Sequence, residues 1–164
     1  MTDLYAVFGN PIAQSKSPEI HQDFARSSGQ DLEYSRQLVA IGAFKEAASA
    51  FFAKGGKGLN ITAPFKLDAY AFAEQLTERA SRAGAVNTLV LQEGGSILGD
   101  TTDGAGMIRD ITVNCGWDIR DKKVLMIGAG GAVRGVLEPL LKEDPARVTI
   151  ANRTETKAEE LAKN

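Results

Sequence analysis

The sequence predicts an α/β protein whose first and larger domain is built on a mainly parallel sheet. Segments typical of buried strands alternate with segments that have the periodicity of amphipathic helices. Turn residues such as Gly9-Asn10-Pro11 and Gly55-Gly56 separate these segments. The chain has 164 residues, 43% of them apolar, and is therefore long enough to bury an ordinary globular core.

The first elements follow from an apolar run, a turn and a helix start. Residues 4–8 are predicted to form a strand because they are apolar and end at the Gly-Asn-Pro turn. Ser17 fits the N-cap of a helix and Pro18 its first position, with Ile20, Phe24 and Ala25 on the apolar side. The same patterns predict a strand, a helix and a strand over residues 34–40, 43–53 and 59–62.

The later elements include a hairpin and then a strand, glycine loop, helix and strand in succession. Pro64 begins a predicted helix that runs to residue 76, and a hairpin around Gly94-Gly95 follows. The remaining elements are predicted as hairpin strands over 86–92 and 96–99, a helix from 103 to about 115, a strand over 123–127, a helix to about 142, a strand over 147–151 and a helix from 154.

A change of composition near residues 101–106 predicts a domain boundary, with one domain over residues 1–102 and a second over 103–164. The second domain carries a single β-α-β unit. Two parallel strands with two helices leave one strand edge open and one sheet face uncovered. We therefore expect this domain to be incomplete, and its open edge is suited to pairing with a second copy of the chain in a homodimer.

Charge, cysteine and histidine content exclude several classes of protein. Lys and Arg total 19 against 21 Asp and Glu, a net charge of −2, so no nucleic-acid partner is expected. Cys115 is the only cysteine, which favours a reducing compartment. No apolar stretch is long enough to span a membrane, and Asp3 stands where a secretory signal needs basic charge, so we expect a cytoplasmic protein. His21 is the only histidine, which argues against a zinc site, and we expect no metal; the side chain itself is expected on the wetter face of its helix.

The glycine loop at residues 128–132 points to a dinucleotide site. A buried strand runs into Gly128-Ala129-Gly130-Gly131-Ala132 and then into a helix, as in the first β-α-β unit of a Rossmann domain. Gly128 permits a tight turn, and Gly130 leaves room for a pyrophosphate at the helix start. Val133 replaces the third glycine of the usual fingerprint, and close packing alone also produces such loops.

The residues after the second strand of this unit favour NADP over NAD. An NAD site offers Asp or Glu to the ribose hydroxyl about twenty residues after the loop, whereas this chain has Asn152-Arg153-Thr154. A guanidinium binds a 2′-phosphate with two charge-assisted hydrogen bonds, and a carboxylate repels it. The alternative is an ordinary helix start with Thr154 as N-cap and Arg153 in solvent.

Polar residues of the first domain lie where ligands bind in open α/β sheets. Ser15 and Ser17 place two hydroxyls at a helix start, an arrangement that suits a carboxylate, although Ser17 also fits a plain N-cap. Asn60, Thr62 and Lys66 follow the end of a strand and can converge above it, although most lysines are simply exposed. Taken alone, the later residues Asn87 and Asp103 fit turns or caps.

Together these segments resemble the shikimate dehydrogenase family over the whole chain. The resemblance is carried by six blocks in the family's order and spacing: SKSP at 15–18, GLNITAPFK at 58–66, GAVNT at 84–88, DTTDG at 100–104, GAGGA at 128–132 and NRTETK at 152–157. It implies a cytoplasmic enzyme that reduces 3-dehydroshikimate to shikimate reversibly with NADPH. The family pattern continues beyond residue 164 with a second Rossmann half.

The resemblance also implies a role for each matching residue. Ser15 and Ser17 hold the substrate carboxylate, and Lys66 transfers the proton beside Asp103. Three residues hold the ring hydroxyls with the support of Asn60: Thr62, Asn87 and Asp103. The cofactor is bound by Gly128, Ala129, Gly130, Gly131, Ala132, Asn152, Arg153, Thr154 and Lys157, with Glu78 approaching the nicotinamide end.

Two other hypotheses remain open at this point. In the first hypothesis, the chain is a shikimate-binding domain without catalysis, because the second Rossmann half is needed to hold NADP. Alternatively it belongs to another two-domain NADP dehydrogenase, such as a quinate/shikimate enzyme or the methylene-tetrahydrofolate type. The hydroxyls of Ser15 and Thr62 favour a small hydroxylated acid over a pterin, because they match a carboxylate and ring alcohols.

Overall fold

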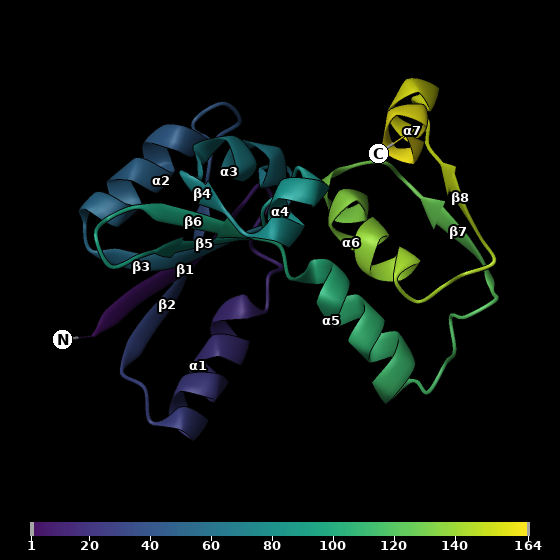
Figure 1. Ribbon diagram of the computed structural model, residues 1–164. Helices are drawn as coiled ribbons and strands as arrows, with labels where there is room; N and C mark the ends of the chain where they lie inside the picture. The colour runs from purple at the N-terminus through teal and green to yellow at the C-terminus, as the bar shows by residue number, and fades with distance from the viewer. Residues whose placement is uncertain (1, 164) are drawn as a thin grey trace. The chain divides into compact units, whose positions relative to one another are not determined.

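The computed structural model describes residues 2–163, which form two compact units (Figure 1). The first unit contains the residues up to Thr77 together with Val86–Asp100, and the second contains Glu78–Ala85 together with the residues from Thr101 onward. The elements in chain order are β1 (Asp3–Gly9), α1 (Ser17–Ser28), β2 (Leu32–Leu38), α2 (Phe44–Ala53), β3 (Gly56–Ile61), α3 (Lys66–Phe72), β4 (Gln75–Leu76), α4 (Glu78–Ala83), β5 (Thr88–Leu91), β6 (Ile97–Asp100), α5 (Asp103–Arg109), a π-helical turn (Asp110–Asn114), β7 (Lys123–Ile127), α6 (Gly131–Leu141), β8 (Arg147–Ala151) and α7 (Glu155–Ala162).

The first unit is built on a sheet with the strand order β2-β1-β3-β5-β6-β4. The pairs β1–β2, β1–β3 and β4–β6 are parallel, whereas β5 pairs antiparallel with both β3 and β6. Helices α2 and α3 cover one face of this sheet and α1 lies on the other (Figure 1). The predicted α/β class with a mainly parallel sheet is therefore confirmed.

Successive residues of β1 point to opposite faces, and each face has its own core. The ring of Phe8 packs edge-on against Phe44 and Phe51 of α2, with ring centroids 6.3 Å and 5.9 Å apart. Val7, on the opposite face, packs in a cluster with Ile12 and Tyr34. This alternation is the period-2 pattern of a strand buried on both sides.

Helix α1 differs from its prediction in both its start and its buried side. Lys16 occupies the N-cap position, so Ser17 is the first helical residue rather than the cap. Ala25 is buried, as predicted, but Ile20 and Phe24 are 47% and 62% exposed, so their place on the apolar side was wrong. Pro18 is also buried, and His21 is half-buried rather than on the wetter face.

The predicted helix over 64–76 is also shorter in the structure. Helix α3 ends at Phe72, and the next residue, Ala73, is extended. The chain then pairs with β6 through the two residues of β4, and the short helix α4 follows. Hydrogen bonds to the hairpin, such as that from the Glu74 N–H to the Ile97 carbonyl, override the local helical preference here.

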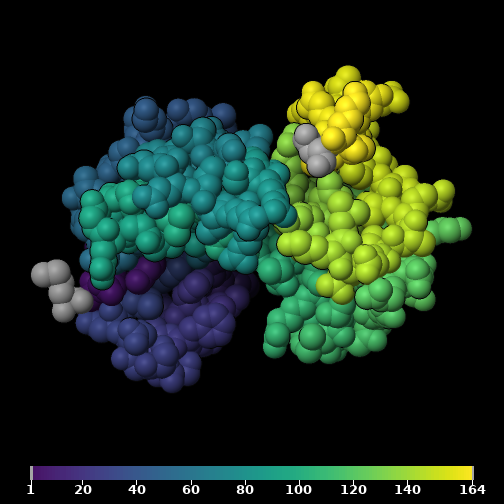
Figure 2. All heavy atoms as spheres, in the orientation of Figure 1, coloured from purple at the N-terminus to yellow at the C-terminus, as the bar shows by residue number. Residues whose placement is uncertain are grey.

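The second unit contains a two-stranded parallel sheet with one covered face. Val124, Met126 and Val148 pack against a buried cluster formed by Ile108, Ile119, Val136 and Leu140. On the opposite face, Leu125 is 61% exposed and Ile127 82% exposed, so the predicted uncovered face is present. Helix α7 protrudes from the rest of this unit, as its yellow atoms in Figure 2 make clear.

Two glycines let α5 and α6 approach each other closely. A Cβ added to Gly104 would overlap the carbonyl oxygen of Gly135 and would lie 2.8 Å from the Cγ of Pro139. A Cβ added to Gly135 would lie 2.8 Å from the hydroxyl of Thr101. These glycines therefore serve helix packing within the second unit.

Candidate functional site

The loop between β1 and α1 brings the hydroxyls of Ser15 and Ser17 together. The Ser15 hydroxyl donates to Oγ of Ser17 at 3.1 Å, and the Ser17 N–H donates to Oγ of Ser15 at 3.3 Å. Neither serine caps the helix through its side chain. The alternative explanation of Ser17 as an ordinary N-cap is therefore wrong, and the pair presents two adjacent oxygens at the helix start.

Arg36 on β2 anchors this loop. Its Nε donates to the carbonyl oxygen of Ser15 at 2.7 Å, and one terminal nitrogen bridges both carboxylate oxygens of Glu19 at 2.5 Å. The hydrogen bond from Arg36 is the main cause that lowers the pKa of Glu19. The guanidinium thereby joins the loop, the helix α1 and the strand β2 at one point.

A series of hydrogen bonds connects three strands of the first unit, β2, β3 and β5. The Tyr34 hydroxyl on β2 donates to Oδ1 of Asn60 on β3 at 2.6 Å. The Asn60 amide donates to Oγ1 of Thr88 at 3.3 Å, and the Thr88 hydroxyl donates to Oδ1 of Asn87 at 2.9 Å. Asn87 is only 7% exposed. The structure therefore connects the predicted site residues Asn60 and Asn87 through Thr88, and adds Tyr34 at the start of the series.

Thr62 and Lys66 lie on the turn that follows β3. The Thr62 N–H donates to the carbonyl oxygen of Phe8 at 2.9 Å, which fixes this turn to the end of β1. Gly9 is needed here, because a Cβ would lie 2.5 Å from Cγ2 of Thr62. Lys66 is the first residue of α3, and its carbonyl oxygen accepts from the Val86 N–H at 3.0 Å.

Asp103 and Glu78, like the predicted cofactor residues, belong to the second unit. Asp103 is the first residue of α5, directly after the hairpin strand β6. Glu78 begins α4, where its carboxylate forms an ion pair with Arg82. Arg82 also contacts Glu138 on α6 at 2.6 Å. The roles of Asp103 beside Lys66 and of Glu78 near the nicotinamide stay predictions.

The predicted cofactor loop connects β7 with the start of α6. Gly128 has a φ of +116°, a conformation that favours glycine, and its N–H donates to the Ala151 carbonyl at 2.7 Å. A Cβ added to Gly130 would meet no atom of the chain within 4 Å, so the packing of the chain does not require glycine there. Gly130 is the N-cap of α6, whose first N–H groups lack partners within the helix. The open space at these donors fits a phosphate group.

The turn after β8 is held by Asn152, whose amide donates to the carbonyl oxygen of Thr154 at 2.7 Å. Thr154 is the N-cap of α7, as predicted, but without a hydrogen bond from its side chain. Arg153 and Lys157 are exposed beside it. Two cations at this turn fit the 2′-phosphate of NADP better than the uncharged ribose of NAD.

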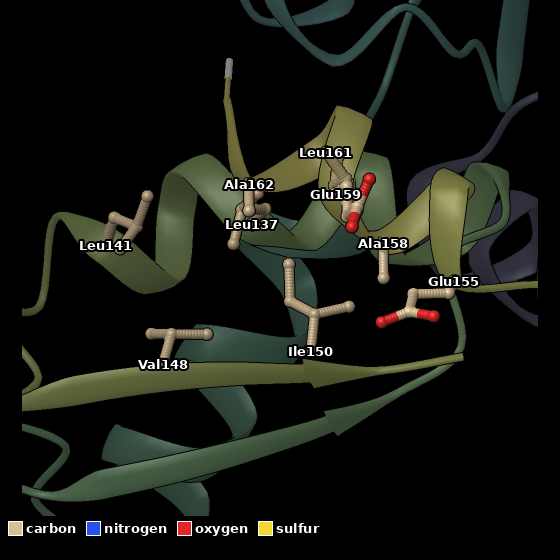
Figure 3. A pocket seen from close by; sticks show the side chains of 9 residues that line it. All are labelled: Leu137, Leu141, Val148, Ile150, Glu155, Ala158, Glu159, Leu161 and Ala162. Atoms are coloured by element: carbon tan, nitrogen blue, oxygen red, sulfur yellow. The ribbon is translucent and has the colours of Figure 1, made fainter.

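A cavity of about 400 Å³ lies elsewhere in the second unit, between α6, β8 and α7 (Figure 3). Its wall is mainly apolar, and the carboxylates of Glu155 and Glu159 are its charged groups. None of the predicted cofactor residues lines it. Carboxylates repel phosphate, so this cavity is distinct from the candidate cofactor site.

Across residues 2–163 no helix is long and apolar enough to cross a membrane. Within the same residues, His, Cys, Asp and Glu side chains do not gather in groups of three that could hold a metal ion.

Two known family models match the chain. Residues 7–89 match the shikimate dehydrogenase substrate binding domain, and residues 111–164 match the shikimate / quinate 5-dehydrogenase family. The curated shikimate dehydrogenase (NADP(+)) of Cellvibrio japonicus is 64% identical over all 164 residues. The chain spans about 59% of the length of that relative.

Solved structures give the same result. The Ael1 enzyme from Pseudomonas putida is 46% identical with a TM-score of 0.88, over 99% of this chain and 59% of that one. Shikimate 5-dehydrogenase from Thermus thermophilus, in complex with NADP(H) and shikimate, is 31% identical with a TM-score of 0.87, over 99% of this chain and 60% of that one. The chain therefore belongs to the shikimate dehydrogenase family.

Proposed function

We propose that the protein catalyses the reversible, NADPH-dependent reduction of 3-dehydroshikimate to shikimate. The proposal is supported by two hydrogen-bonded groups of the first unit, the pair Ser15–Ser17 and the series that orients Asn60 and Asn87. Hydroxyls and amides suit a carboxylate and ring alcohols, the groups that shikimate carries. The Thermus thermophilus neighbour, solved with NADP(H) and shikimate, supports the same ligands.

In this proposal, Ser15 and Ser17 donate hydrogen bonds to the substrate carboxylate. Thr62, Asn87 and Asp103 bind the ring hydroxyls, and Asn60 orients Asn87 through Thr88. An amide whose oxygen already accepts a hydrogen bond presents its NH2 group to a ligand oxygen in a fixed direction.

Lys66 and Asp103 are the proposed catalytic residues. When NADPH is bound, its nicotinamide supplies the hydride that reduces the ketone. The ammonium of Lys66 gives a proton to the ketone oxygen as it becomes a hydroxyl, and in the reverse direction the amine takes that proton back. Asp103 holds the lysine through its opposite charge.

The cofactor site is proposed on the glycine loop and on the turn after β8. The loop residues Gly128–Ala132 place backbone N–H groups at the pyrophosphate, and Arg153 and Lys157 receive the 2′-phosphate. Asn152 and Thr154 shape this turn, and Glu78 approaches the nicotinamide. Residues 1–102 then form the substrate domain, and residues 103–164 the first half of the cofactor domain.

Two further properties are proposed on other grounds. A cytoplasmic location is inferred from the lone Cys115, since proteins of oxidising compartments usually pair their cysteines.

A homodimer is inferred from the exposed face of β7 and β8, which a second copy would cover. Gel filtration that shows only a compact monomer at high concentration would count against the dimer.

Turnover is tested by the absorbance of NADPH with shikimate and NADP, on this chain and on a fusion that carries the C-terminal part of the Cellvibrio japonicus relative. Lys66→Ala in the fusion is expected to lower kcat by about 10²–10⁴-fold, the usual contribution of a proton-transfer group. The affinity for shikimate should change little, because the pocket remains. Lys57→Ala, an exposed lysine on β3, is the matched control. Equal losses of affinity and rate would make Lys66 a binding residue instead.

Calorimetric titration separates the enzyme from its main alternative, a shikimate-binding domain without catalysis. An intact enzyme binds both shikimate and NADP, whereas a binding domain takes shikimate alone. Rates with shikimate and quinate then identify the preferred substrate, since the second family that matches covers both acids.

A further inference from the structure

Tyr34 lies at the centre of the polar groups of the first unit but is itself a core residue. Its side chain is only 5% exposed and packs with Val7 and Ile12. The imidazole of His21 stacks on its ring, with centroids 4.4 Å apart and planes 6° from parallel. The ring is thus held on two sides, which fixes where its hydroxyl lies.

The hydrogen bonds that start at this hydroxyl run in one direction. Tyr34 donates to Oδ1 of Asn60, so the Asn60 amide must present its NH2 group to Thr88. The hydroxyl of Thr88 accepts from that amide and uses its single proton to donate to Oδ1 of Asn87. Each bond therefore determines the orientation of the next group, and the Asn87 amide is the last of the series.

Burial keeps the hydroxyl of Tyr34 protonated, so that it can donate. Desolvation is the main cause that raises the pKa of Tyr34 to about 12. The phenol is therefore neutral at physiological pH and keeps the proton that it donates to Asn60.

We propose that Tyr34 is a positioning residue that orients the Asn87 amide of the substrate site through Asn60 and Thr88. The inference rests on the proposed function for the identity of the ligand, whereas the coupling itself is a property of the chain. Tyr34 need not touch the substrate: it sets the direction in which Asn87 donates. Removal of its hydroxyl leaves Oδ1 of Asn60 without this donor, and the amide loses its preferred orientation.

The test compares Tyr34→Phe with Tyr5→Phe. Tyr5 pairs with Tyr34 in the β1–β2 register and lines the same cavity of about 220 Å³, but its hydroxyl takes no part in the series. Tyr34→Phe is expected to weaken shikimate binding by calorimetry about tenfold, and Tyr5→Phe by less than about twofold. Equal effects of the two substitutions would overturn the inference.

A second measurement excludes a merely structural role. In a double-mutant cycle with Asn87→Ala, the combined variant should bind shikimate about as weakly as Asn87→Ala alone, because Tyr34 acts through Asn87. If the losses of shikimate affinity in the two single variants multiply in the combined variant, the two residues act independently, and the coupling is overturned. If thermal unfolding shows that Tyr34→Phe is not folded, Thr88→Val takes its place, because it interrupts the same series.

Nuclear magnetic resonance of the side-chain amides tests the coupling without any ligand. The order parameters of the Asn60 and Asn87 NH2 groups should fall in Tyr34→Phe and remain unchanged in Tyr5→Phe. Unchanged order in Tyr34→Phe would overturn the inference even if shikimate binds. If the wild-type protein binds no shikimate but the amide order parameters fall in Tyr34→Phe as expected, only the proposed function is contradicted.

Discussion

The two compact units close their hydrophobic cores in different ways. The largest fully buried side chains, including those of Phe8 and Phe65, all belong to the first unit, whose sheet carries helices on both faces. In the second unit, alternate residues of β7 such as Ile127 face solvent, because helices cover only one face of the two strands. The first unit therefore buries both faces of its sheet with its own residues, whereas the second leaves one face of its two-stranded sheet exposed.

The same contrast holds for the groups that bind ligands. The first unit uses side chains, oriented by one another through hydrogen bonds from Tyr34 to Asn87. The second uses backbone N–H groups at the start of α6 and the space left by Gly130. Side-chain sites depend on packing around each residue, whereas a helix start requires little beyond the loop itself.

The largest difference is expected between a substitution in the core of the first unit and one on the exposed sheet face of the second. Phe8→Ala should lower the free energy of unfolding by about 3–5 kcal/mol, because it removes a ring that contacts two others and leaves a cavity. Ile127→Ala should change it by no more than about 0.5 kcal/mol, since that side chain is 82% exposed. Urea unfolding measures both. A large loss in Ile127→Ala would mean that the exposed face is covered in solution.

A smaller effect is expected from two glycines of the second unit. Gly104→Ala should lower the free energy of unfolding by about 1–3 kcal/mol, because its Cβ overlaps the Gly135 carbonyl oxygen. Gly130→Ala should leave stability nearly unchanged, because its Cβ meets no atom of the chain, but should weaken NADP binding. Unfolding and calorimetric titration of both variants separate packing from ligand contact. Unchanged NADP affinity in Gly130→Ala would argue against a phosphate at this position.

The smallest effect is a dependence of the first unit on pH through His21. Burial lowers the pKa of His21 from 6.5, so the folded state binds its proton less readily than the unfolded chain. The free energy of unfolding should therefore fall as the pH decreases below about 6.5, down to the lowered pKa. Unfolding of wild type and His21→Gln at pH 8 and pH 5 measures this. The variant should lose less stability on acidification, and an identical loss would assign the pH dependence to other groups.

The sequence predicted the parts of the fold that local patterns determine. Strands such as β7 and β8 were located to the residue, because apolar runs bounded by turns define them. The short elements β4 and α4 were missed, since pairing with the hairpin rather than local preference creates them. Ile20 and Phe24 were assigned to the wrong side of α1 because helical periodicity does not show which partner covers the helix.

For the candidate site, the sequence identified residue types and their positions at strand ends and helix starts. It singled out Asn60 and Asn87, but neither Tyr34 nor Arg36, which look like ordinary strand residues in the sequence. A tyrosine and an arginine within one strand give no local signal of a role in a ligand site. Their contacts are 26 and 21 residues away along the chain.

By itself, the sequence determined the α/β class and the glycine loop, and it predicted the chemistry of the ligands. These follow from the period of the apolar residues, the conformations that only glycine favours and the charges near each turn. Only the tertiary structure decided which side chains meet, which face of each helix is buried and in which direction the amides of Asn60 and Asn87 point. Such contacts join residues far apart in the chain, and their geometry exists only once the sheet has formed.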